Sequence, residues 1–294
     1  MSVKLLDHKE KNQATHILRP LSPYGLYPES SVILDQNCGY FNSEIPFSLF
    51  KADLEREKNY YSDMQWLYDE EIYLYAAIML ARNEDQGRVL FYPCARNELY
   101  LRIENEAKLL KELKNILKAE SKKWKVDKFN IGIPQKNSEY EFQEVKYDHD
   151  LIQLIFSSIN RSDNLIFRGL TTLIKSNMLK FQIPFQEEGA NTLYISMEAS
   201  HQIILRKLKE EGVKNPTTRD AANYLHDAFG DPPKLRTLKY FEEFYEDRIM
   251  SLHPENRFGV FPYPPLSVSH FYHLHSSLCD VYRWLITGNA KFTT

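Results

Sequence analysis

The sequence predicts a mainly α-helical protein whose N-terminal half mixes helices and strands. After about residue 148, apolar residues recur at helical spacing in one segment after another. Before that point, short runs rich in β-branched and aromatic residues alternate with helical segments. A polar stretch with glycine and proline at residues 129–150 separates the two regions. We therefore predict an N-terminal α+β domain over residues 1–147 and a C-terminal helical bundle over residues 148–294.

The N-terminal domain is expected to contain both kinds of element. Residues 1–30 are polar and rich in proline, which predicts an arm or loop. SVILDQ (31–36) and GRVLFYPC (87–94) have the composition of short strands. Apolar periodicity predicts helices over residues 69–84 and 98–124.

The C-terminal half is expected to be a set of amphipathic helices joined by short connections, which is the pattern of a helical bundle. The predicted helices cover residues 150–160, 165–179, 187–212, 217–230, 234–253 and 267–288. Gly212, Gly230 and Gly288 stand where three of these helices should stop, because glycine readily adopts the left-handed conformation of a helix C-terminus.

Composition excludes several classes of protein. The formal net charge of −3 gives no global basic field for nucleic acid, so any such surface must be local. The three cysteines are far apart and lack CxxC spacing, which argues against a disulfide framework or a zinc site. No stretch is long and apolar enough for a membrane helix. We expect a cytoplasmic protein without a membrane partner.

The stretch EDRIMSLHPENRFG at residues 246–259 carries the main functional signal. Arg248 shares the apolar face of a predicted helix with Phe244, although a buried guanidinium is costly without a partner or a role. Pro254 disfavours helical backbone at His253, so the helix should end just before that residue. At such a helix end, the imidazole can turn back towards Arg248.

This pair of side chains suits phosphoryl transfer on RNA. His253 would take the proton of a ribose 2′-OH or give one to the leaving 5′ oxygen. Arg248 would stabilise the charge that develops on the phosphate oxygens. The nucleophile belongs to the substrate, so we expect no metal and no cofactor. A structural interpretation is that Arg248 stacks on Phe244 and His253 caps the helix C-terminus.

The order of these features resembles the HEPN superfamily of small helical bundles, many of which cleave RNA. Its signature is Arg-x(4–6)-His after an aromatic and acidic lead-in, which FEEFYEDRIMSLHP matches, followed by a final helix such as SHFYHLHSSLCDVYRWLITG. The resemblance covers about residues 150–288. It implies Arg248 and His253 as the catalytic pair of a homodimeric, metal-independent endoribonuclease. It further implies a toxin or antiviral defence effector, with a regulatory protein as possible partner and residues 1–147 as its recognition or regulatory domain.

One residue departs from the pattern. Active members of the superfamily often carry a polar residue directly after the arginine, whereas this chain has Ile249. The alternative function is therefore a non-catalytic HEPN-like module for dimerisation or for nucleotide or RNA binding.

The segment KLLKELKNILKAESKKWKVDK at residues 108–128 is the one basic run. One interpretation is an amphipathic helix with a solvated lysine face. The other is a contact with the RNA backbone, in which an aromatic side chain stacks on a base. The candidate RNA-binding residues are Lys118, Lys122, Lys123, Trp124 and Lys125.

Other histidine patterns are weaker. His270 and His273 have helical metal-site spacing, but no carboxylate is near them in sequence. His201, in Glu198-x-x-His201, falls in an apolar stripe and is expected to be a core histidine. A second Arg-x(4–6)-His match, Arg219 to His226, lies within a regular helical pattern, and we interpret it as coincidence.

Overall fold

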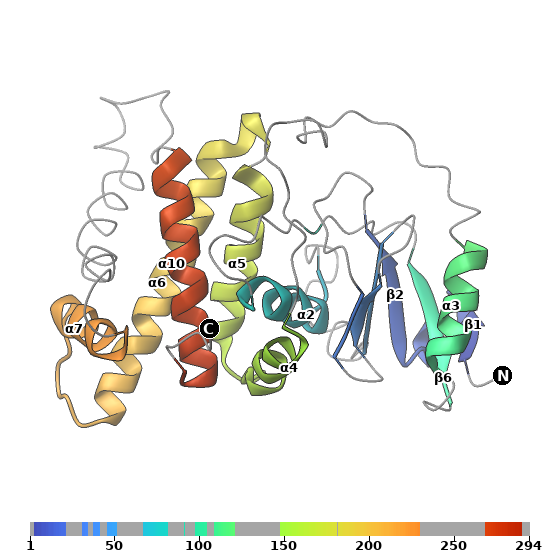
Figure 1. Ribbon diagram of the computed structural model, residues 1–294, viewed down its shortest axis with the longest axis horizontal. Helices are drawn as coiled ribbons and strands as arrows, with labels where there is room; N and C mark the ends of the chain where they lie inside the picture. The colour runs from blue at the N-terminus through green and yellow to red at the C-terminus, as the bar shows by residue number, and fades with distance from the viewer. Residues whose placement is uncertain are drawn as a thin grey trace. The chain divides into compact units, whose positions relative to one another are not determined.

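The computed structural model of the protein describes parts of both predicted regions. The described residues are 3–21, 31–34, 38–41, 46–51, 67–81, 91, 98–104, 109–120, 148–180, 182–229 and 268–289. The chain divides into two compact units, the first formed by Met1–Ile78 with Asp85–Phe156 and the second by Met79–Glu84 with Ser157–Thr294. The fold is mainly helical with an N-terminal antiparallel sheet (Figure 1), which confirms the predicted fold class at this level.

The sheet of the first unit has six strands in the order β1-β6-β2-β5-β4-β3, and every neighbouring pair is antiparallel. The strands are β1 (Val3–Leu6), β2 (His16–Pro20), β3 (Val32–Ile33), β4 (Gly39–Phe41), β5 (Phe47–Lys51) and β6 (Leu99–Ile103). A 3-10 helix, η1 (His8–Gln13), joins β1 to β2. Strand β2 pairs with both β5 and β6, so it lies inside the sheet.

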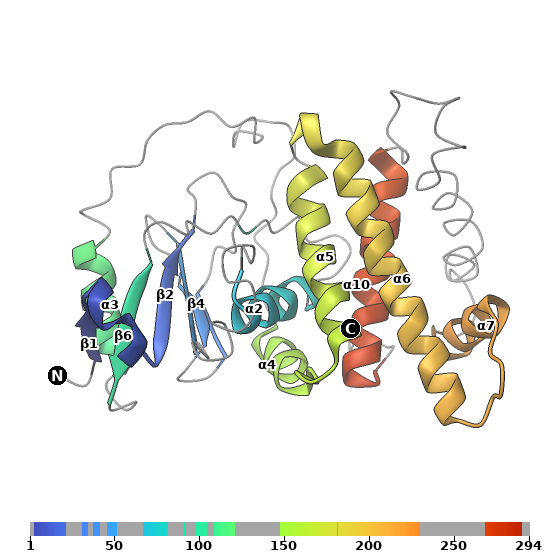
Figure 2. The same ribbon diagram turned by 180° about the vertical axis from the view of Figure 1, so that it is seen from behind.

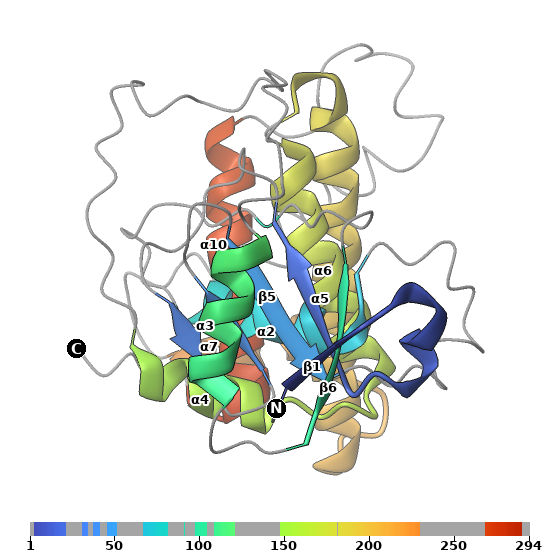
Figure 3. The same ribbon diagram turned by 90° about the vertical axis from the view of Figure 1, so that its right-hand side faces the viewer.

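The two faces of the sheet are covered by different helices of this unit. Helix α3 (Leu109–Glu120) covers one face of the sheet, as Figure 3 shows. Its Leu113 and Leu117 belong to the same apolar core as Leu18, Leu49 and Leu101 of the strands. Side chains alternate along a strand, so the residues next to these in sequence point to the opposite face. Helix α2 (Asp69–Leu80) contacts that opposite face through polar side chains.

Of the predictions for the N-terminal half, two are confirmed, one is wrong, and one is wrong in part. The strand expected at 31–36 is present as β3, and the helix expected at 69–84 is present as α2. Residues 1–30 were expected to form an arm or loop, yet they hold β1 and β2. All five residues of β2 are buried, because an inner strand is covered on both faces. It therefore lacks the alternation that marks a half-exposed strand.

The helix predicted over 98–124 is a strand followed by a helix. Leu99–Ile103 forms β6, and helix α3 begins only at Leu109. In LYLRI, Leu99, Leu101 and Ile103 share one face of the sheet, and this period of two was hidden next to the strong helical period that follows. The strand predicted at 87–94 lies outside the described residues except for Phe91, and so does most of the linker predicted at 129–150.

The second unit contains a bundle of three long helices packed side by side (Figures 1 and 2). These are α5 (Asn164–Lys180), α6 (Gln186–Glu210) and α10 (Val268–Thr287). A short 3-10 helix, η5 (Ile183–Phe185), links α5 to α6. Helix α7 (Thr218–Phe229) packs on α6, and its Tyr224 and Phe229 contact the ring of Trp284 in α10.

The bounds of these helices follow from local signals. Asp163 accepts hydrogen bonds from the first backbone N–H groups of α5, and Thr217 and Asp220 form a capping box at the start of α7. Gly212 and Gly288 follow α6 and α10 with φ of +99° and +72°, in the region that favours glycine. Five of the six helices predicted after residue 148 are confirmed, the first as α4 (His149–Ser158). The sixth, at 234–253, lies outside the described residues.

Candidate functional site

The predicted catalytic pair lies in a part of the chain that the structure does not describe. Arg248 and His253 fall within residues 230–267. Four of the five candidate RNA-binding residues are also outside the described residues, and these are Lys122, Lys123, Trp124 and Lys125.

Lys118 is the candidate RNA-binding residue that can be placed. It lies on α3 with Lys111 and Lys114, and all three side chains are exposed. Their spacing of three and four residues puts them along one outward face of the helix. The opposite face packs on the sheet through Leu113 and Leu117. Helix α3 is therefore amphipathic as predicted, with its lysines available to solvent.

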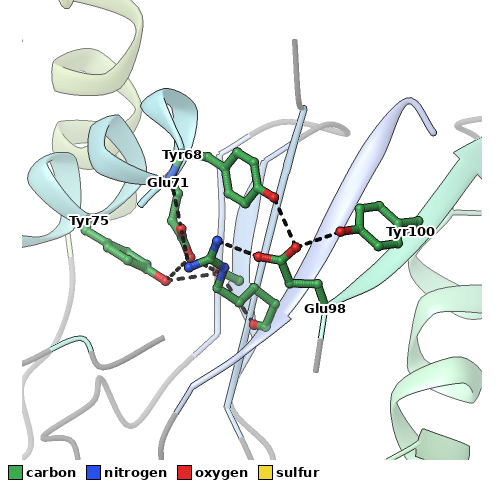
Figure 4. A network of polar contacts seen from close by, with 7 residues as sticks. Tyr68, Glu71, Tyr75, Glu98 and Tyr100 are labelled. Carbon is green, nitrogen blue, oxygen red and sulfur yellow. Dashed lines mark hydrogen bonds and ion pairs between the residues drawn. The ribbon is translucent and has the colours of Figure 1, made fainter. Parts of the chain in front are cut away.

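The described residues also contain a buried polar network that sequence reasoning missed (Figure 4). We call it the Arg19 network. Its members are Arg19, Ser48, Tyr68, Glu71, Tyr75, Glu98 and Tyr100. They come from β2, β5, α2 with the residue before it, and β6 with the residue before it, so tertiary packing alone brings them together.

Glu71 occupies the innermost position of the network and is fully buried. Its Oε1 accepts hydrogen bonds from the hydroxyls of Tyr75 (2.6 Å) and Ser48 (3.1 Å). Its Oε2 lies 3.5 Å from Nη1 of Arg19. The same oxygen accepts the backbone N–H of Tyr68 at 3.4 Å, at the start of α2. The carboxylate thus joins α2 to β2 and β5.

Glu98 holds the second acidic position, nearer the surface. Its Oε1 accepts from Nη2 of Arg19 at 2.6 Å. Its Oε2 accepts from the hydroxyls of Tyr68 (3.0 Å) and Tyr100 (2.9 Å). The guanidinium carbon of Arg19 lies 4.8 Å from the ring centroid of Tyr68. One guanidinium therefore bridges two carboxylates and also stacks against an aromatic ring.

Burial shifts the titration of these groups. Burial raises the pKa of Glu71, although Arg19 and the hydrogen bonds from Tyr75 and Ser48 oppose the shift. Burial and the charge of Glu98 raise the pKa of Tyr100 to about 12. The same two causes raise the pKa of Tyr68 further. The tyrosines therefore remain protonated near neutral pH and act as hydrogen-bond donors.

This arrangement is suited to holding elements in place. The oxygens of both carboxylates already accept hydrogen bonds or ion pairs from within the network. A buried charge that is paired and hydrogen-bonded in this way fixes the orientation of the elements that carry it. A signal does exist in the sequence, since Glu71 and Tyr75 are polar groups at i and i+4 in the mostly apolar helix EEIYLYAAIML.

The histidines of the second unit separate into core and surface positions. His201 is buried in the stripe formed by Met197, Ile204 and others, so its prediction as a core histidine is confirmed. His270 and His273 are exposed. Across the described parts of the chain, no group of three or more His, Cys, Asp or Glu side chains could hold a metal ion.

The second Arg-x(4–6)-His match can be placed as well. Arg219 is exposed and His226 is half-buried, both on α7. Seven residues of α-helix separate their backbones by about 10 Å along the axis. Their helix continues unbroken between them, so neither side chain is turned towards the other by a helix end.

Comparisons with protein-family models, curated proteins and solved structures found no match to this chain. Of the helices in the described residues, none is long and apolar enough to cross a membrane.

Proposed function

We propose that the chain is a metal-independent endoribonuclease whose C-terminal half is a HEPN-like helical bundle. The observation that carries the proposal is the sequence Arg248-x4-His253-Pro254, at the end of the helix predicted over residues 234–253. The long helices α5, α6 and α10 support it, because a bundle is the kind of scaffold on which this superfamily carries its catalytic pair.

Cleavage proceeds by transfer within the substrate. The imidazole of His253 takes the proton of a ribose 2′-OH, and the oxygen attacks the adjacent phosphorus. The bond to the 5′ oxygen breaks, and the imidazolium of His253 returns its proton to that oxygen as it leaves. The products are a 2′,3′-cyclic phosphate and a 5′-OH end. Arg248 stabilises the charge on the phosphate oxygens throughout.

The basic segment that includes α3 supplies the RNA contact in this proposal. Lys118 contributes from the exposed face of α3, and Lys122, Lys123, Trp124 and Lys125 continue the segment. Replacing the four lysines with methionine should reduce the slope of log affinity against log salt for single-stranded RNA by up to about 3. An unchanged slope would remove this segment from the RNA-binding surface.

The biological role follows from the same resemblance. We propose a homodimer in which two catalytic pairs form one groove, restrained by a regulatory protein until triggered, as a toxin or defence effector. Expression of the wild-type chain should then inhibit growth, and expression of His253→Ala should not.

Incubation of the purified protein with total RNA in EDTA tests the activity. Cleavage should persist in the chelator and yield cyclic-phosphate ends. Arg248→Ala and His253→Ala should each reduce the rate by about 10²–10⁴, the range of general acid–base and electrostatic contributions. The matched control is Arg219→Ala with His226→Ala, which removes the other Arg-x(4–6)-His pair. Cleavage that stops in EDTA, or that survives loss of His253, would contradict the mechanism.

A second function is favoured by one observation, the apolar Ile249 directly after the arginine. In this alternative the bundle dimerises and binds RNA or a nucleotide without cleaving it. Intact RNA in every reaction, together with a dimer and a measurable RNA affinity, would favour this function over the nuclease.

A further inference from the structure

Lys180, the last residue of α5, is in an unusual environment for a lysine. Its relative exposure is only 4%, whereas lysines ordinarily extend their ammonium group into water. Among the residues that the structure describes, its Nζ has no hydrogen-bond partner and no paired carboxylate. Burial lowers the pKa of this amine, because the charged form loses its hydration.

Helix α10 contacts the ammonium of Lys180, and helix α6 contacts the backbone of the same residue. Nζ lies 5.0 Å from the ring centroid of Phe271, in the first turns of α10. Helix α6 approaches the backbone of α5 here so closely that a Cβ at Gly189 would lie 3.0 Å from the backbone nitrogen of Lys180. Lys180 is the last residue of α5, and Figure 2 shows that α5 stops at the end of the bundle where α6 and α10 start.

The positive charge at this place is incompletely balanced. An aromatic face stabilises an ammonium only in part. The negative C-terminal end of α5 and the positive N-terminal end of α6 oppose each other, and Glu187 and Glu188 lie in the first turn of α6. The positive end of α10 remains, with no acidic residue in its first turn. None of the described groups is a counter-ion in hydrogen-bonding contact with Nζ, so the ammonium itself is the group that can attract an anion.

A purely structural role explains these observations less well. A lysine that caps the C-terminus of a helix donates to its last carbonyl groups, and Lys180 donates to none of the described ones. A lysine that only fills space could be replaced by methionine, which has a similar shape and no charge to desolvate. Buried charged side chains that lower the stability of the folded protein are more typical of binding sites than of structural cores.

The geometry points to an oxyanion-binding site at this end of the bundle, in which the ammonium of Lys180 holds the phosphate or carboxylate group of a ligand. The ring of Phe271 forms its apolar wall. Pro184 and Phe185 in η5, a few residues further along the chain, are exposed. Of Lys180 and Phe271, it is Lys180 that carries the positive charge of this site. The site is independent of RNA cleavage and goes beyond the proposed nuclease.

Thermal unfolding in different anions tests the proposal. The wild-type protein is compared in phosphate, acetate and chloride at equal ionic strength. An oxyanion at about ten times its dissociation constant should raise Tm by roughly 3–6 °C over chloride. A rise with phosphate alone assigns a phosphate ligand, and a rise with acetate alone assigns a carboxylate. No rise with either anion would overturn the site.

Variants of two lysines on α5 complete the test. Lys180→Met should unfold at a higher temperature than wild type in chloride and lose the anion-specific rise. Lys175→Met is the matched control, since Lys175 is exposed on the same helix, and it should keep the full rise. Lys180→Gln provides a second, polar replacement with the same expected loss. A full rise in either Lys180 variant, or a lower Tm of Lys180→Met in chloride, would overturn the proposal.

Discussion

Tyr282 of α10 packs so closely against Gly169 of α5 that a methyl group at residue 169 would overlap its phenol ring. The Tyr282 hydroxyl donates to the carbonyl of Ser196 in α6 at 2.7 Å. The Ser196 hydroxyl in turn donates to the carbonyl of Gly169 at 2.9 Å. These three residues thus join all three long helices of the bundle.

Gly169→Ala should destabilise the protein through this contact. Overpacking costs about 1–3 kcal/mol, and the better helix propensity of alanine returns up to about 1 kcal/mol of it. A double-mutant cycle with Tyr282→Leu, measured by urea unfolding, isolates the overlap. Gly169→Ala should cost much less when Tyr282 is already leucine. Equal costs in both backgrounds would show that the overlap does not limit the packing.

Arg19→Met should be among the most destabilising changes in the N-terminal unit. It leaves Glu71 and Glu98 buried without their cation, and breaking such a pair costs about 3–5 kcal/mol. Adding Glu98→Gln should recover part of the loss, because one of the two unpaired charges is removed. Arg102→Met is the control, since its ion pair with Glu104 is exposed and should contribute little. Denaturant midpoints of the four proteins give the comparison.

The pH dependence of stability should report on Glu71. Burial raises its pKa in the folded protein above the ordinary value of 4.5, so the folded state binds this proton more tightly than the unfolded state. Its contribution is therefore most favourable below 4.5 and is lost as pH rises through the folded pKa. Glu71→Gln, which cannot ionise, should decline less over this interval. The free energy of unfolding as a function of pH decides the point, and parallel curves for the two proteins would contradict it.

Two substitutions of Asp163 should separate the stability that comes from its helix cap from the stability that comes from its ion pair. Its Oδ1 accepts the N–H groups of Leu165 (3.0 Å) and Ile166 (3.4 Å), and its carboxylate pairs with Arg206 of α6. Asp163→Ala loses both and should cost about 1–2 kcal/mol, mostly from the cap. Asp163→Asn keeps a capping oxygen and loses only a partly exposed ion pair, so it should cost less than about 1 kcal/mol. Chemical denaturation that finds equal losses would assign the stabilisation to the charge instead.

The sequence by itself determined the helices of the C-terminal half. Their apolar period, capping residues such as Thr217 and terminal glycines such as Gly212 are local signals, and local signals can be read without knowing what a helix packs against. It also supplied the Arg248 and His253 pattern on which the proposed nuclease rests.

Tertiary structure alone decided the N-terminal sheet and the two buried polar sites. An inner strand such as β2 is covered on both faces, so its sequence carries no alternation, and its partners β5 and β6 lie far along the chain. The Arg19 network likewise collects residues from positions 19 to 100. Lys180 looks like an ordinary helix-terminal lysine in the sequence, and only the packing of α6 and α10 around it shows that its charge is buried. The physical reason is that burial depends on neighbours distant in sequence, whereas propensity and capping depend on neighbours a few residues away.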